Sequence, residues 1–365
     1  MGKTPSRNRR EYWSGENIIW ISISDLSAVK SHVITNSKEH ITQLAVDETG
    51  IKPIPPNTVV MSFKLSIGKV AITTKISYTN EAIIAFLPKN NINISPLYLY
   101  YSLQSYDWSQ SGNRAVMGKT LNKATLKLLP FCLHAIDEQK QICAKLSLID
   151  AAISIKTNQL VKLDKLIKSQ FVSMFGNFAI NDKNWYTAPL SLLGSFKNGL
   201  NFSLDKTGNQ IKCLGVGDFQ NNDIISYTDM SDIDLNTIPD NSYLLQDDDI
   251  VFVRSNGNKH LVGRCVCVKT DSKLATFSGF CIRFRKLTNQ VDTIYLIYAL
   301  KNSYIKSKII GQGANVQNIN QKTLRDVCVP IPPLKLQLEY AELIKSINKS
   351  KFVELRELHL PHRSA

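Results

Sequence analysis

Leu121-Asn-Lys-Ala-Thr-Leu126 resembles Ile319-Asn-Gln-Lys-Thr-Leu324, 198 residues further along the chain, with the Asn, the Thr and the final Leu in common. Just upstream, Leu97-Tyr-Leu-Tyr-Tyr-Ser-Leu103 matches Ile294-Tyr-Leu-Ile-Tyr-Ala-Leu300 at an offset of 197, and the one-residue slip fits a single insertion or deletion in a loop. Such a period is too long for a solenoid repeat, so it indicates that one whole unit occurs twice.

The match extends in both directions, at offsets between 191 and 198. Downstream, Gln139 corresponds to Gln337, and Ile149 corresponds to Ile347. Upstream, fainter matches join Gly2–Ser6 to Gly194–Asn198, Ile21–Leu26 to Leu214–Phe219, and Val59–Phe63 to Ile250–Val253. Each match alone could arise by chance, but their common order indicates a duplication.

We therefore predict an α+β protein in which two similar lobes are separated by long, coiled-coil-like helices. In each lobe, short β-like runs such as Val59–Phe63 alternate with turn clusters. The predicted parts are a first lobe at 1–130, a helical segment at 131–176, a second lobe at 177–330 and a shortened helical segment at 331–365.

The first helical segment contains neither Pro nor Gly between Asp137 and Gly176. Its apolar residues are spaced alternately by three and four, which is the pattern of a helix packed on another helix. At about 1.5 Å per residue, roughly 38 residues make a rod of about 57 Å. The same pattern would suit a long helix folded onto its own domain. The residues of this predicted seam are Ile142, Leu146, Ile149, Ile153, Leu160, Leu163, Ile167 and Met174.

The second helical segment begins with the same seam, at Ile344 and Ile347, and then departs from it. Lys351 replaces an apolar seam residue, and Pro361 falls where the first copy has Leu163. Because proline breaks a helix, the second helix is predicted to be shorter by about four turns.

The chain carries a net charge of +14, spread over the globular regions, which favours a polyanionic partner such as nucleic acid or an anionic membrane. Its loops are rich in Lys and Arg, which neutralise phosphates, and in Asn and Gln, which can pair with base edges. Ordinary turns have a similar composition, but these loops recur at matching places in both lobes. The predicted DNA contacts are Lys3, Thr4, Ser6, Arg7, Lys64, Lys69, Arg114, Lys119, Lys197, Arg254, Asn256, Lys259, Arg264, Asn315 and Gln317.

The sequence shows no catalytic or metal-binding motif. Its seven cysteines form no C-x-x-C pair, as expected for reduced, partly buried thiols of a cytosolic protein. No phosphate-binding P-loop occurs, and Asp247–Asp249 is interpreted as the solvated start of a strand rather than a metal site. We expect no cofactor and no metal. The absence of an apolar run of about 18 residues predicts that no segment spans a membrane.

Together these features resemble the specificity subunit of type I restriction–modification systems. The motifs that carry the resemblance are Gly2-Lys-Thr-Pro-Ser6 followed by Tyr12-Trp13, and Pro330-Ile-Pro-Pro-Leu-Lys-Leu-Gln337, with a degenerate first copy at Leu129–Gln139. Two departures from the family are a missing short lead-in before Gly2 and the shortened second helix.

The resemblance implies a cytoplasmic, non-catalytic subunit whose two lobes read the halves of a split target in double-stranded DNA. It also implies that the helices set the gap between the halves and hold methyltransferase subunits, with a restriction subunit as a further partner. Two alternatives remain open. One is a DNA-modifying enzyme with an unrecognised active site. The other is a helical scaffold that binds nucleic acid non-specifically.

Overall fold

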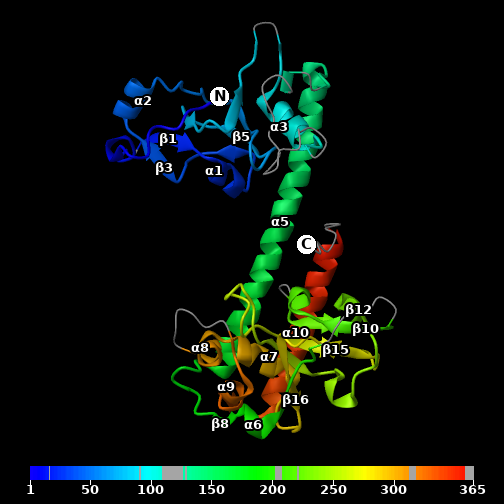
Figure 1. Ribbon diagram of the computed structural model, residues 1–365. Coiled ribbons are helices and arrows are strands. Elements are labelled where there is room, and N and C mark those ends of the chain that lie inside the picture. Colours follow the sequence, from blue (N-terminus) through cyan, green and yellow to red (C-terminus); the bar gives the residue numbers. More distant parts are fainter. Residues whose placement is uncertain are drawn as a thin grey trace. The chain divides into compact units, whose positions relative to one another are not determined.

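The computed structural model describes residues 1–15, 17–89, 92–108, 126–127, 130–201, 208–219, 222–311 and 318–357. The chain divides into two compact units, Met1–Ile155 and Lys156–Ala365. The long helix α5, Ile136–Phe175, gives its first half to unit 1 and its second half to unit 2 (Figure 1).

Unit 1 contains a four-stranded sheet in the order β2-β5-β4-β7 and a three-stranded sheet in the order β3-β1-β6. The strands are β1 (Ile18–Ile21), β2 (Val33–Ile34), β3 (Glu39–Ile41), β4 (Val59–Ser62), β5 (Val70–Thr73), β6 (Tyr78–Thr79) and β7 (Ile83–Phe86). Besides α5, the helices are η1 (Arg10–Tyr12), α1 (Ile23–Ala28), α2 (Gln43–Thr49) and α3 (Pro96–Gln104).

The four-stranded sheet of unit 1 is buried on both faces. Val59 and Met61 pack with α3 residues, while the alternate residue Val60 packs with Ile19 and Ile21 of β1. Successive side chains of a strand point to opposite faces. This is why β4 and β5 consist of continuous runs of buried residues rather than alternating polar and apolar ones.

Unit 2 repeats this plan with additions. Its five-stranded sheet has the order β11-β14-β13-β16-β9, its three-stranded sheet the order β12-β10-β15, and β8 and β17 form a ribbon. The strands are β8 (Tyr186–Pro189), β9 (Gly194–Asn198), β10 (Asn209–Leu214), β11 (Ile224–Ser226), β12 (Ser231–Leu235), β13 (Ile250–Val253), β14 (Cys265–Lys269), β15 (Ala275–Phe277), β16 (Cys281–Lys286) and β17 (Cys328–Ile331). The helices are α6 (Leu190–Leu193), η2 (Val216–Phe219), η3 (Tyr227–Asp229), η4 (Asn241–Tyr243), α7 (Thr293–Lys301), α8 (Ser303–Ile310), α9 (Gln321–Arg325) and α10 (Leu334–Glu357).

The predicted duplication is confirmed by the strand pairing. β4 pairs antiparallel with β5 through Val59↔Ile72, and β13 pairs antiparallel with β14 through Ile250↔Cys267. In each unit a further short strand, β2 or β11, joins the second strand of this hairpin in parallel. The three-stranded sheets also share one pattern, since β1 and β10 each have one antiparallel and one parallel neighbour.

A buried glutamine fixes the start of the long helix in each unit. In unit 2 the Gln337 amide donates to the carbonyls of Pro332 (2.7 Å) and Gln290 (3.1 Å) and accepts from the Asp292 N–H at 2.8 Å. The side chains of Gln337 and of its counterpart in unit 1, Gln139, are both fully buried. In unit 1 the Gln139 amide makes the three corresponding bonds. It donates to the carbonyls of His134 (2.9 Å) and Asn93 (3.2 Å) and accepts from the Ser95 N–H at 2.9 Å.

The predicted apolar seam is buried at its two ends and exposed in its middle. In unit 1, Ile142 and Leu146 pack against the core around α3. In unit 2, Ile167 is buried in one cluster with Ile344 and Ile347 of α10. Between these ends the side chain of Ile149 is 54% exposed and that of Ile153 is 43% exposed, so here the expectation of helix packing is not met within the chain. Leu160 is partly buried, and Leu163 packs against the unit 2 cluster.

Beyond the cluster around Ile167, two ion pairs join the second half of α5 to α10. Lys156 contacts Glu354 and Lys351 contacts Asp164, each at 2.6 Å. The Tyr340 hydroxyl adds a bond of 3.3 Å to the Ile167 carbonyl. Among the described helices, none combines the length and the apolar character that crossing a membrane would require.

Replacing Gln337 by Met should lower the free energy of unfolding of unit 2 by about 2–4 kcal/mol, because one buried and two partly buried backbone groups lose their partner. Hydrogen exchange of the β13 amides reports this stability directly. The control is Glu339→Met, at an exposed position two residues away on the same helix. This substitution should change the free energy of unfolding of unit 2 by less than about 0.5 kcal/mol. Equal effects of the two substitutions would contradict the role of the amide.

Candidate nucleic-acid interface

The hairpins β4–β5 and β13–β14 end in loops that close in the same way. Ser62 N donates to Lys69 O (3.0 Å) and Gly68 N donates to Ser62 O (3.0 Å). In unit 2, Val253 N donates to Arg264 O (2.8 Å) and Gly263 N donates to Val253 O (3.0 Å).

Both glycines of these closures have a left-handed backbone, with φ of 82° at Gly68 and 75° at Gly263, a conformation that favours glycine. Each glycine is followed by a basic residue, Lys69 or Arg264. The loops so closed differ in length, since they span 63–67 and 254–262. The fold therefore places one basic residue at the equivalent position of each hairpin, while the rest of the loop differs in length.

The N-terminal segment lies beside the hairpin of unit 1. Gly2 N donates to Ile83 O at 3.3 Å, and a Cβ at Gly2 would lie only 2.0 Å from Thr79 O, so glycine is required there. The Thr4 hydroxyl donates to the Glu81 carboxylate. That bond, and in smaller part the charge of Lys64, lowers the pKa of Glu81. The structure thus joins Thr4 to a carboxylate 77 residues further along the chain.

Arg7 is held by groups of its own unit. Its guanidinium donates two bonds to the Glu39 carboxylate, one of them 2.9 Å long, and lies 3.7 Å from the centre of the Trp13 ring. The bond from Arg7 lowers the pKa of Glu39. Lys3 donates to Thr49 O (2.7 Å), and Ser6 O accepts from the Trp13 indole (3.1 Å). The sequence offered no signal for the pair of Arg7 with Glu39, because Glu39 is 32 residues away.

The longer loop of unit 2 folds on its own polar side chains. The Asn256 side chain accepts from Asn258 N at 2.8 Å, and Ser255 forms a bridge with Asn318. Asn256, Phe280 and Asn318 line a shallow depression of about 440 Å³. Four of the predicted DNA contacts lie outside the described residues, namely Arg114, Lys119, Asn315 and Gln317.

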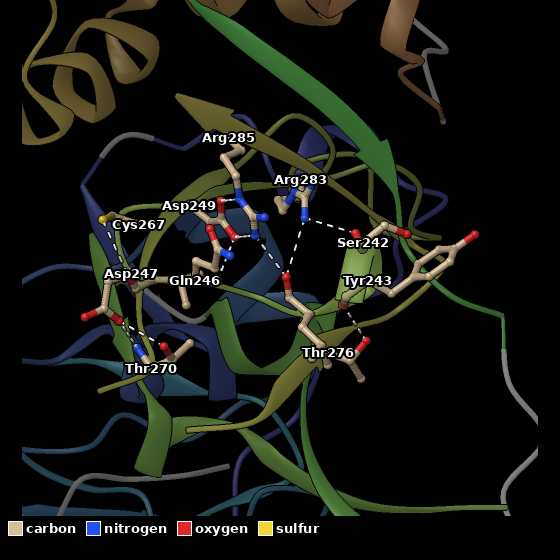
Figure 2. Close-up of polar contacts among 12 residues, drawn as sticks. Ser242, Tyr243, Gln246, Asp247, Asp249, Cys267, Thr270, Thr276, Arg283 and Arg285 are labelled. Atoms are coloured by element: carbon tan, nitrogen blue, oxygen red, sulfur yellow. Dashed lines mark hydrogen bonds and ion pairs between the residues drawn. The ribbon is translucent and has the colours of Figure 1, made fainter. Parts of the chain in front are cut away.

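In unit 2, two arginines of β16 lie beside Asp249, one of the residues Asp247–Asp249 that were expected to form the solvated start of a strand. Asp249, expected to be solvated, is only 1% exposed. Figure 2 shows both of its oxygens turned to Arg285, at 2.8 and 2.7 Å. The expectation failed because Arg285 lies 36 residues further along the chain and only the pairing of β13 with β16 brings it close.

Arg283 and Lys197 complete this cluster. Arg283 is buried and donates to the carbonyls of Ser242 (3.0 Å) and Leu244 (3.4 Å), as Figure 2 shows for its contact with Ser242. Burial lowers the pKa of Arg283. Lys197 is its neighbour across the strands, and the ammonium of Lys197 lies 4.2 Å from the centre of the Tyr243 ring. The cluster therefore holds the segment 242–249 against the sheet.

These loops offer cations, amides and hydroxyls, which suits contacts to phosphates and base edges. The carboxylates among them, Glu39, Glu81 and Asp249, each accept bonds from a donor of their own unit. Among the described residues, no three His, Cys, Asp or Glu side chains gather where they could hold a metal ion.

The family model described as "Type I restriction modification DNA specificity domain" matches residues 1–165 and 182–358. The MjaIX specificity subunit of Methanocaldococcus jannaschii is 31% identical over 180 residues, which are 48% of this chain and 41% of that protein. The StySPI specificity subunit of Salmonella potsdam is 25% identical over 275 residues, or 70% of this chain and 58% of that protein. The chain thus matches less than two thirds of the length of these relatives.

Solved structures share the fold. The S subunit of a type I restriction–modification system from M. genitalium has a TM-score of 0.53 and 16% identity, with 98% of this chain and 88% of that one covered. A chain from a structure on the assembly and conformational transition of a type I R–M system has a TM-score of 0.60 and 13% identity, covering 93% of this chain and 87% of that one.

Replacing Asp249 by Asn should destabilise unit 2 by about 3 kcal/mol, because it removes the charge that compensates the largely buried Arg285. The matched control is Asp248→Asn, which breaks the exposed pair with Lys269 and should cost less than about 1 kcal/mol. Hydrogen exchange of the β13 and β16 amides measures the loss of stability in both variants. A loss no larger for Asp249→Asn than for its neighbour would refute the structural role of the buried pair.

Proposed function

The chain belongs to the type I restriction modification DNA specificity family, and on that premise we propose that it is a sequence-reading subunit that binds double-stranded DNA. Lobe 1 would read one half of a split target, and lobe 2 would read the other. The observation that carries this proposal is the repeated hairpin, in which a glycine of left-handed backbone precedes Lys69 in one unit and Arg264 in the other.

In this proposal the equivalent cations anchor the duplex through its phosphates, which fixes the register without reading sequence. The unequal loops between the hairpin strands, at 63–67 and 254–262, then contact different bases. Two cations at equivalent hairpin positions, Lys69 and Arg264, with two different loops would suit a bipartite, asymmetric target. Lys3, Lys64, Arg254, Asn256 and Lys259 remain proposed contacts beside these anchors.

We further propose that α5 acts as a ruler between the lobes, with 131–176 and 331–365 as the spacer regions. Its 40 residues give a rod of about 60 Å. Half-sites on one face of B-DNA recur at about 34 Å, so a rod of this length can serve successive major grooves.

The proposed partners, and the proposed lack of catalysis by this chain, are those expected for a specificity subunit of this family. The exposed apolar middle of α5, with Leu148, Ile149, Ile153 and Ile155, is the proposed seat for methyltransferase subunits, and a restriction subunit joins the complex in the cytoplasm. The chain itself is proposed to be non-catalytic. Incubation of the purified chain with duplex DNA, Mg²⁺ and a methyl donor should give neither cleavage nor methylation, and turnover by the chain alone would favour the enzyme alternative.

Lys69→Gln should weaken binding to all duplex sequences about equally and reduce the slope of log affinity against log salt by about one, because one phosphate contact is lost. Lys52→Gln, at an exposed position away from the hairpin loop, is the matched control and should leave the slope unchanged. Gel-shift titrations at several salt concentrations measure both. An unaltered slope for Lys69→Gln would remove this residue from the interface.

Deleting one heptad from the exposed middle of α5, residues 148–154, should shorten the preferred gap between half-sites by about three base pairs, since about 10 Å of helix is lost. The half-site sequences should stay the same. A random-duplex selection, performed with the presumed methyltransferase present, measures both properties. A variant with Asp150 and Ser154 of this heptad replaced by alanine keeps the helix length and the apolar side chains of the proposed methyltransferase seat, so it should keep the gap. An unchanged gap in the deletion variant would exclude the ruler.

A further inference from the structure

An exposed aromatic ring lies beside the hairpin loop of unit 2. Phe280 belongs to the turn between β15 and β16, and it is 61% exposed. Together with Asn256 and Asn318 it lines the shallow depression of about 440 Å³. An apolar ring left in water forgoes the stabilisation that burial would give it. The ring is thus available for contact with a ligand that approaches the loop.

The turn that carries Phe280 is held by backbone hydrogen bonds from two other segments. On one side, the Phe280 carbonyl accepts from Arg254 N at 2.7 Å. On the other side, the Leu200 carbonyl accepts from Gly279 N at 2.8 Å. Because these bonds fix the backbone of the turn, little conformational freedom is lost when the ring meets a ligand, which favours binding.

Unit 1 has the opposite arrangement at the equivalent place. Phe63 N donates to Ala82 O at 2.9 Å there, just as Arg254 N donates to Phe280 O in unit 2. Phe63 is 1% exposed and Ala82 is 7% exposed. In unit 1 the aromatic residue is therefore buried at the start of the loop, and a small buried residue occupies the turn. The exposed ring is a property of unit 2 and not of the shared fold.

The surroundings of the ring suit the base edges of duplex DNA. The hairpin beside it carries Arg254, Lys259 and Arg264, whose charges attract a polyanion. The amides of Asn256 and Asn318, which line the same depression, are groups that can pair with base edges. A two-stranded β-ribbon fits the major groove of B-DNA, which is about 12 Å wide. The ring would then face the major-groove edges of the bases.

Thymine presents the apolar group among these edges. Guanine, adenine and cytosine show hydrogen-bond donors and acceptors in the major groove, whereas thymine adds a C5-methyl group. A phenyl ring that covers a polar edge removes its water and gives no hydrogen bond in return. The same ring against a methyl group removes apolar surface from water on both partners. The chemistry of Phe280 therefore favours thymine over the other bases.

We propose that Phe280 contacts the C5-methyl group of a thymine in the half-target bound by unit 2, and so determines the base at one position of that half-target. The inference rests on the proposed function and deepens it, because it names the group that one side chain recognises. Since the buried Ala82 occupies the equivalent position, unit 1 reads its own half-target without such a ring.

Removal of single methyl groups from the DNA tests the proposal. The preferred duplex is first obtained by a random-duplex selection with the full chain and the presumed methyltransferase. Each thymine of that duplex, on either strand, is then replaced singly by uracil, which differs from thymine only by the missing C5-methyl group. At one thymine of one half-target the replacement should weaken binding about fourfold, the effect of losing one buried methyl group. Fluorescence anisotropy titrations measure the dissociation constants.

The dependence of this effect on Phe280 is the decisive measurement. Phe280→Ala should bind the thymine and uracil duplexes equally at that position, because the ring that the methyl group touches is gone. Phe280→Leu keeps an apolar side chain and should retain a ratio of about twofold. The matched control is Leu287→Ala, which removes an exposed apolar side chain at the opposite end of β16 and should leave the fourfold ratio unchanged. Thymines of the other half-target should respond to uracil alike in all four chains.

The contrary results are distinguishable. A selection that yields no preferred duplex would contradict the proposed function, and this inference with it. A preferred duplex for which Phe280→Ala keeps every thymine-to-uracil ratio of the parent chain would overturn the inference alone. That second result includes an equal loss of affinity for both duplexes, which is expected if the ring inserts between base steps instead of touching a methyl group.

Discussion

A buried side-chain amide joins each lobe to its long helix, and the rest of the architecture depends on this connection. Gln139 and Gln337 each satisfy three backbone groups that no secondary structure pairs. A buried polar backbone group without a partner costs free energy. The helix can therefore leave the lobe in one direction only while the amide stays in place. Because both copies use the same bonds, both lobes hold their helices by the same geometry.

The sheets buried on both faces supply the second constraint. β4 and β13 are flanked by apolar layers, so the hairpins that they form cannot shift register without exposing a whole row of side chains. Within these hairpins the loops differ in length, while the closing bonds at Gly68 and Gly263 stay the same. This separation of a rigid frame from variable loops suits a protein that must read different sequences with one fold.

Charge inside the lobes is organised for structure as well as for binding. Arg7 is engaged by Glu39 and by Trp13, and Arg285 by Asp249, so a positive side chain in this chain is not by itself a sign of a nucleic-acid contact. Lys69 differs from these, because it is exposed at the end of a rigid hairpin. The distinction rests on partners that are distant in sequence, which composition and spacing do not reveal.

The amino-acid sequence alone determined the duplication, the two mixed lobes and the long helix α5, because these features are written in local periodicity and in repeated motifs. Tertiary structure decided which apolar residues of that helix are covered, since Ile142 and Ile167 meet a core while Ile149 does not. It also decided that Asp249 is buried against Arg285. The physical reason is common to both. Burial and pairing depend on what the fold brings to a residue from elsewhere in the chain, and a linear pattern records only what the residue itself can offer.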